Sequence, residues 1–104
     1  MNKWPHAPPH WFHPHGTYVV TGATYLKRHF FSHYSDLDFF QTTMFDCARE
    51  FDFRLHAWSI FSNHYHVLGQ DLGLGRTHQM LEKLHFLVAQ FANSRDAKPG
   101  RKVM

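Results

Sequence analysis

The feature that most constrains the fold is a pair of strand-like runs joined by two turn residues. Residues 53–61 alternate in character, and their expected faces are Phe53, Leu55, Ala57, Ser59 and Phe61 on one side and Arg54, His56, Trp58 and Ile60 on the other. Ser62 and Asn63 favour a tight turn. The run 64–70 then comes straight back, so the sequence predicts two antiparallel strands.

One more strand and a helix precede this pair. Residues 17–21 are rich in β-branched and aromatic side chains and predict a strand that Gly22 ends. Residues 23–34 show no clear periodicity and are expected to form a loop. Ser35 and Asp38 predict a capped helix over residues 36–50. Its expected apolar stripe is Leu37, Phe40, Met44, Cys47, Ala48 and Phe51.

A second helix is predicted from Thr77 to Asn93, after Gly73 and Gly75 break the third strand. Its expected apolar stripe is Met80, Leu84, Leu87, Val88 and Phe91. The order strand, helix, strand, strand, helix predicts an α+β fold, a split βαβ arrangement with the final elements missing. We expect one domain, with an irregular arm at 1–15, a core at 16–95 and a basic tail at 96–104.

Length and composition exclude several classes of protein. The 104 residues suit one compact domain. No apolar run approaches the roughly 20 residues of a membrane helix, and residues 1–9 lack the apolar segment of a secretory signal. A single cysteine, Cys47, excludes an internal disulfide and is expected to pack within the first helix. These features predict a cytoplasmic location without a membrane span.

The positive charge is unevenly distributed. Residues 1–70 hold five basic and five acidic residues, whereas residues 71–104 hold six basic and three acidic ones. A basic final third favours contact with phosphates, although a solvated helix face with a basic tail would look the same. The candidate DNA-binding residues are Arg76, Lys83, Arg95, Lys98, Arg101 and Lys102. Weaker candidates for stacking on bases, with core packing as the alternative, are Trp4, Trp11, Tyr25 and Phe31.

The chemistry of the chain centres on His64 and His66. Residues i and i+2 of a strand share a face, so the two imidazoles are expected side by side, with Tyr65 pointing the other way. Two adjacent imidazoles form half of a divalent-metal site. With 11 histidines, such spacing also arises by chance, and two exposed polar residues remain the alternative. A second pair, His13 and His15, lies in a Pro-rich arm where no strand sets its geometry.

The segment 58–68, Trp-Ser-Ile-Phe-Ser-Asn-His-Tyr-His-Val-Leu, resembles the signature of the IS200-like, or REP-associated, tyrosine transposases. Residues 18–25 resemble the first strand of that HUH (His-hydrophobic-His) family and the loop after it, and residues 84–93 resemble its following helix. The likeness covers about residues 16–95. One departure is Phe61-Ser62, where many members have Met-Pro before the Asn.

The resemblance implies a ferredoxin-like fold with an antiparallel sheet, helices on one face, and a homodimer. It implies metal-dependent cleavage and rejoining of hairpin-bearing single-stranded DNA, with Mg²⁺ or Mn²⁺ bound by His64 and His66 and with Asn63 supporting the turn. The family nucleophile is a tyrosine on a later helix, but no tyrosine follows Tyr65. Tyr18, Tyr25 and Tyr34 lie upstream, so we expect a truncated or inactive form without a catalytic residue of its own.

Two other functions fit the same residues. A non-catalytic ferredoxin-like module that binds single-stranded nucleic acid would need no metal. A small oligomeric domain with a histidine-rich surface would have no nucleic-acid role. Metal dependence separates the first alternative from the transposase, because a simple binding module is indifferent to the loss of His64 and His66.

Overall fold

The structure, a computed structural model, describes residues 16–104. Its elements are β1 (Thr17–Ala23), the short 3-10 helix η3 (Tyr25–Lys27), α1 (Tyr34–Glu50), β2 (Phe53–Ile60), β3 (His64–Asp71) and α2 (Thr77–Asp96). The order of strands and helices confirms the predicted α+β fold. The predictions for Trp4, Trp11, His13 and His15 lie outside the described residues.

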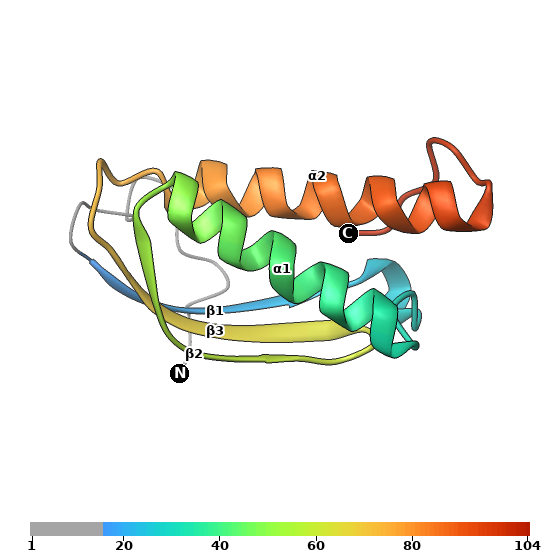
Figure 1. The fold of residues 1–104 in the computed structure, drawn as a ribbon, viewed down its shortest axis with the longest axis horizontal. Helices are drawn as coiled ribbons and strands as arrows, with labels where there is room; N and C mark the ends of the chain where they lie inside the picture. The colour runs from blue at the N-terminus through green and yellow to red at the C-terminus, as the bar shows by residue number, and fades with distance from the viewer. Residues whose placement is uncertain (1–15) are drawn as a thin grey trace.

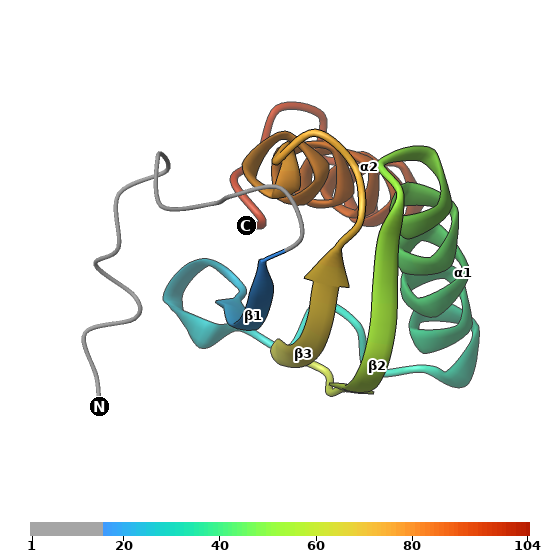
Figure 2. The same cartoon turned by 90° about the vertical axis from the view of Figure 1, so that its left-hand side faces the viewer.

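The three strands form one antiparallel sheet in the order β1-β3-β2. Because β1 and β2 both run antiparallel to β3, they are parallel to each other, and β3 lies between the two strands of a βαβ unit. Both helices lie on the same side of the sheet (Figures 1 and 2). This arrangement is consistent with the ferredoxin-like fold and leaves one sheet face without a covering helix among residues 16–104.

The core lies between the sheet and the helices. Strand alternation sends Tyr18 and Val20 of β1 and Tyr65 and Val67 of β3 toward the helices, where all four are buried. The predicted helix stripes face them, with buried Phe40, Met44, Cys47 and Ala48 from α1 and buried Met80, Leu84 and Val88 from α2. Ala92, outside the predicted stripe, is buried as well, and the other predicted positions are partly buried: Leu37, Phe51, Leu87 and Phe91. Cys47 is packed as expected, and burial raises the pKa of its thiol.

The predicted faces of β2 are wrong beyond His56. The register with β3 shifts between Leu55 and Ala57, which marks a β-bulge at His56. A bulge adds one residue and so reverses the alternation after it. Trp58 therefore points toward α1, where its indole N–H donates to Gln41 at 3.0 Å, and Ala57 lies on the open face, opposite Leu68.

Three predicted boundaries also change. Gly22 does not end β1, since the strand runs on to Ala23. The first helix begins at Tyr34, not at residue 36, and its cap is His33, whose backbone N–H donates to the Asp36 carboxylate at 3.1 Å. The predicted cap of Ser35 with Asp38 is therefore two residues late. Asn93 does not end α2, which continues to Asp96 and stops at left-handed Ala97.

The helix α1, with 17 residues, is shorter than a typical membrane span, and α2 is more polar than one. The longer one, α2, has 20 residues and carries charged side chains along its outer face. No helix within residues 16–104 is long and apolar enough to cross a membrane.

Candidate metal centre and nucleic-acid interface

The structure places His64 and His66 side by side on the open face of the sheet, at the start of β3. Their ring centroids are 5.1 Å apart, with the ring planes nearly perpendicular. Across the sheet, His64 is paired with Ala23 of β1, and His66 lies between Thr21 of β1 and Ser59 of β2. The central strand thus presents both imidazoles on one face, as the i, i+2 spacing predicted.

Asn63 sets the tautomer of His64. The Asn63 side-chain amide donates from Nδ2 to the Lys27 carbonyl at 3.1 Å, so its Oδ1 is the atom that faces His64 Nδ1, at 2.9 Å. A carbonyl oxygen only accepts hydrogen bonds, so His64 must carry its proton on Nδ1. The lone pair of Nε2 is then available to bind a metal ion.

Two further contacts orient the pair. His66 Nδ1 lies 3.0 Å from the Thr21 hydroxyl, which holds that ring nitrogen and leaves Nε2 on the other side of the ring. Phe61 stacks on the face of His64, with centroids 4.6 Å apart and planes 14° apart. Stacking covers the ring face and leaves its edge open. Thr21 and Phe61 are therefore positioning residues that the histidine motif alone does not reveal.

These residues fit half of a divalent-metal site. Two imidazoles that share one ion at metal–nitrogen distances of about 2.1 Å place their ring centres roughly 5 Å apart, as His64 and His66 do. Residues 16–104 contain no group of three or more His, Cys, Asp or Glu side chains that could hold a metal ion. The remaining positions would fall to water, to phosphate oxygens or to groups outside the described residues.

Tyr65, between the two histidines, points into the core. It is fully buried, and its hydroxyl lies 2.7 Å from His85 Nε2 of α2. Burial raises the pKa of the Tyr65 phenol far above its usual value. Tyr65 and Tyr18, which is also buried, are thus excluded as nucleophiles on the open face, whereas Tyr25 and Tyr34 are exposed.

His85 predicts a specific pH dependence of stability. Burial lowers the pKa of His85 below its ordinary value of 6.5, because the charged imidazolium loses solvation. The His85 imidazole then binds a proton more readily in the unfolded chain than in the folded one. The free energy of unfolding should therefore be highest above about pH 6.5 and decrease as the pH falls below that value. His85→Gln keeps a partner for the Tyr65 hydroxyl and should flatten this fall. Urea unfolding at pH 7, 6 and 5 measures it, and parallel profiles for the two proteins would contradict the assignment.

Three of the six predicted DNA-binding residues, Lys83, Arg95 and Arg101, already pair with carboxylates within the domain. Lys83 pairs with Glu50 at 2.6 Å, and the Arg76 guanidinium lies 4.7 Å above the Phe51 ring. Arg95 and Arg101 both bind Asp96, and Arg95 also binds the buried carboxylate of Asp36 at 3.0 Å. Arg95 thus joins the end of α2 to the start of α1.

Three cations, among them the predicted Lys102, lie in or against the loop that follows β1. The Tyr25 backbone N–H donates to the Val103 carbonyl at 2.7 Å, and the Lys102 ammonium lies 5.6 Å from the Tyr25 ring centre. The C-terminal residues thus meet the loop that follows β1, which carries Lys27 and Arg28. Within residues 16–104, none of the three cations pairs with a carboxylate. Lys98, also without an acidic partner among the described residues, lies farther along, after the end of α2.

Of the two predicted stacking residues that the structure describes, one is buried and the other is exposed. Phe31 is a core residue, 1% exposed, and contacts Phe40 edge to face, so the alternative of core packing is correct for it. Tyr25 is 41% exposed, with the Lys102 ammonium near its ring.

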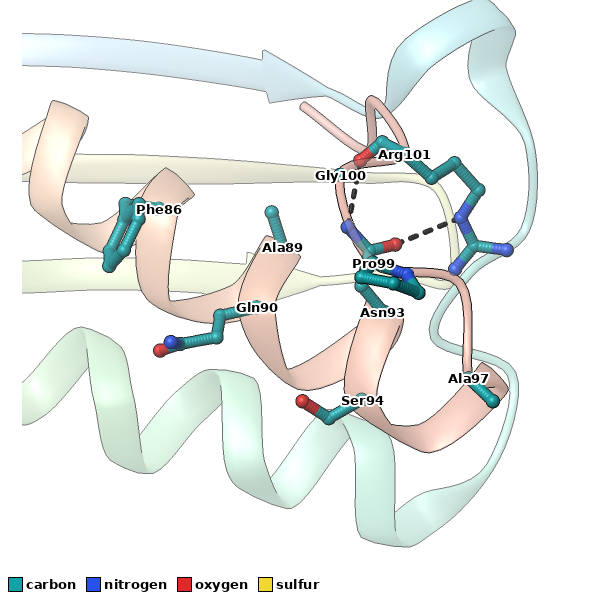
Figure 3. A pocket seen from close by; sticks show the side chains of 9 residues that line it. All are labelled: Phe86, Ala89, Gln90, Asn93, Ser94, Ala97, Pro99, Gly100 and Arg101. Carbon is teal, nitrogen blue, oxygen red and sulfur yellow. Dashed lines mark hydrogen bonds between the residues drawn. The ribbon is translucent and has the colours of Figure 1, made fainter.

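The largest hollow described is elsewhere. It has a volume of about 550 Å³ and is lined by the outer face of α2 and the turn after it (Figure 3). Two of its polar side chains bind one another, since Asn93 donates to the Arg101 carbonyl at 2.8 Å and accepts from the Arg101 guanidinium at 2.9 Å. The residues that line the hollow include no carboxylate, imidazole or thiol.

Comparisons with protein-family models, with curated proteins and with solved structures find no match to this chain.

Proposed function

We propose that this chain is the metal-binding and DNA-binding domain of an HUH-type transposase that acts on single-stranded DNA. The observation that carries the proposal is the His64–His66 pair, with its two Nδ1 atoms held by Asn63 and Thr21. The family motif supplies the identity of the substrate, and the geometry of the pair supports the chemistry. The hairpin in the DNA and the homodimer stay predictions from the resemblance.

Each residue of the proposed site has a separate role. His64 and His66 would hold Mg²⁺ or Mn²⁺, and Asn63 and Thr21 keep the imidazole edges turned outward. At such a site a bound divalent ion supplies charge neutralisation on the non-bridging oxygens of a phosphodiester. Lys27, which lines a hollow together with His64, suits the backbone of a single strand, because it lacks an acidic partner in the described part of the chain.

The alternative of a metal-independent binding module is less well supported. Sheets that recognise single strands without metal commonly stack bases on exposed aromatic rings. The uncovered face of this sheet carries aliphatic Val19 and Leu68 at its centre, and no Phe, Tyr or Trp of the three strands described points there. The exposed ring beside the two imidazoles is Phe61, one face of which is already stacked on His64.

The test is binding of a fluorescent oligonucleotide, a hairpin with a single-stranded tail, with and without Mn²⁺. We expect Mn²⁺ to strengthen binding by the wild type and the double variant His64→Ala/His66→Ala to lose that increase, a loss of about 10-fold or more. The matched control is His56→Ala/His78→Ala, which removes one histidine from β2 and one from α2, both outside the pair, and should keep the increase. Mn²⁺ binding without DNA, followed by electron paramagnetic resonance, should show the same pattern.

Two outcomes would count against the proposal. An affinity for the oligonucleotide that changes neither with Mn²⁺ nor with the loss of the histidine pair would indicate the metal-independent module. A wild-type protein that binds neither Mn²⁺ nor the oligonucleotide would exclude both functions.

A further inference from the structure

A second hollow lies beside His64, on the loop side of the pair. It has a volume of about 340 Å³ and is lined by Thr21, Ala23, Lys27, Asn63 and His64. No carboxylate is among these residues, and Lys27 is the one permanently charged group. A hollow lined by a lysine and a histidine and by no acid is suited to an anion.

The backbone at Lys27 is strained, and Asn63, in the turn before His64, holds this backbone in place. Leu26 and Lys27 both adopt left-handed conformations, with φ values of 55° and 54°. Residues other than glycine rarely do so, and such strain persists only where the surroundings determine it. Here Asn63 donates to the Lys27 carbonyl at 3.1 Å, and the Lys27 N–H donates to the Thr24 carbonyl at 3.0 Å.

One amide therefore links the strained loop to the candidate metal centre. Oδ1 of Asn63 orients His64, while Nδ2 of the same side chain fixes Lys27. The Asn63 carbonyl also accepts the Thr24 backbone N–H at 3.0 Å, which ties the start of the loop to the turn. Any change in the position of the His64 ring is thus coupled to the position of Lys27.

We propose that this hollow is a phosphate subsite in which the Lys27 ammonium binds a non-bridging oxygen of the phosphodiester located at the His64–His66 pair. The inference rests on the proposed function and adds a residue to it. Lysine suits this role as a compact point charge on a flexible stem. The ligand class is a phosphodiester of single-stranded nucleic acid, and Lys27 is a binding residue that orients it.

The test compares Lys27→Met with Arg49→Met. Both remove one positive charge, but Arg49 lies near the end of α1, where it pairs with Asp46 on the surface. The end of α1 leads into Phe53, which pairs with Asp71 at the opposite end of β3 from His64. Affinity for the hairpin-tailed oligonucleotide is measured against salt concentration in the presence of Mn²⁺.

For one lost phosphate contact on a single strand, the slope of log affinity against log salt should become shallower by about 0.7. We expect this change in Lys27→Met and in a second neutral variant, Lys27→Gln. Lys27→Arg and Arg49→Met should keep the wild-type slope, and Mn²⁺ affinity without DNA should be unchanged in all of them. Circular dichroism checks that each variant is folded.

Two results overturn the inference, and they are distinguishable. If the wild type binds the oligonucleotide with Mn²⁺ and both neutral variants keep its slope and affinity, the Lys27 subsite is wrong while the proposed function stands. If the wild type shows no Mn²⁺-dependent binding, the proposed function and the subsite are both wrong.

Discussion

Gly22→Ala is expected to lower the free energy of unfolding by about 3 kcal/mol. A Cβ at this position would lie 2.2 Å from Cε1 and 2.6 Å from Cζ of Tyr65. The ring cannot move away at low cost, because Tyr65 is fully buried and its hydroxyl is bound to His85. Glycine is needed at this position of β1 because the Tyr65 ring of the neighbouring strand occupies the space that a side chain would need.

Thermal unfolding gives the first measurement, with an expected loss of about 10 °C or more. Val19→Ile is the matched control, because it adds a methylene to the same strand on the open face and should change stability by less than about 0.5 kcal/mol. Tyr65→Leu makes room for the added methyl group, so Gly22→Ala/Tyr65→Leu should cost less than the sum of the two single changes, by about 1 kcal/mol or more. Strict additivity would show that the ring and the new methyl group do not meet.

Asp71→Ala is expected to cost about 3 kcal/mol as well, through unsatisfied hydrogen bonds. Asp71 is 1% exposed, and its carboxylate accepts the Gly73 N–H at 2.8 Å, the Gly75 N–H at 3.4 Å and the Thr77 hydroxyl at 2.8 Å. Alanine would leave these donors without a partner in the turn between β3 and α2. Thr77 is itself buried, so water cannot readily replace the lost acceptor.

Asparagine at the same position should be milder. Its Oδ1 still accepts both glycine N–H groups, and its amide can donate to the Thr77 hydroxyl, so Asp71→Asn should cost about half as much as Asp71→Ala. The control is Asp46→Ala, which removes an exposed carboxylate from its surface pair with Arg49 and should cost less than about 1 kcal/mol. Urea unfolding of the three variants makes the comparison. Equal losses for Asp71→Ala and Asp46→Ala would show that the turn does not depend on its acceptor.

Local sequence patterns were sufficient to predict the order of the elements along the chain and most of their buried faces. The period of 3.6 placed Phe40 and Met44 on the buried stripe of α1 and Leu84 and Val88 on that of α2. The period of two placed His64 and His66 together and sent Tyr65 into the core. These predictions depend on residues close in sequence, whose relative directions follow from backbone geometry alone.

Contacts between distant residues decided the rest. The bulge at His56 follows from the pairing of β2 with β3, so no alternation within the run 53–61 could reveal the reversed faces. The acidic partners of Arg95 show the same limit, because the buried Asp36 lies at the start of α1 and is distant in sequence. Charge counting therefore selected Arg95 and Arg101 as DNA contacts without seeing that Asp36 and Asp96 already neutralise them.

By itself, the sequence determined the α+β order, the buried helix stripes and the pairing of His64 with His66, because periodicity acts over a few residues. Only the tertiary structure decided which groups surround that pair. Thr21 and Lys27 are brought to it from β1 and from the loop after it by sheet pairing and by the Asn63 amide. Such neighbours depend on how the strands pack and on side-chain hydrogen bonds across about 40 residues of chain, and no local pattern encodes them.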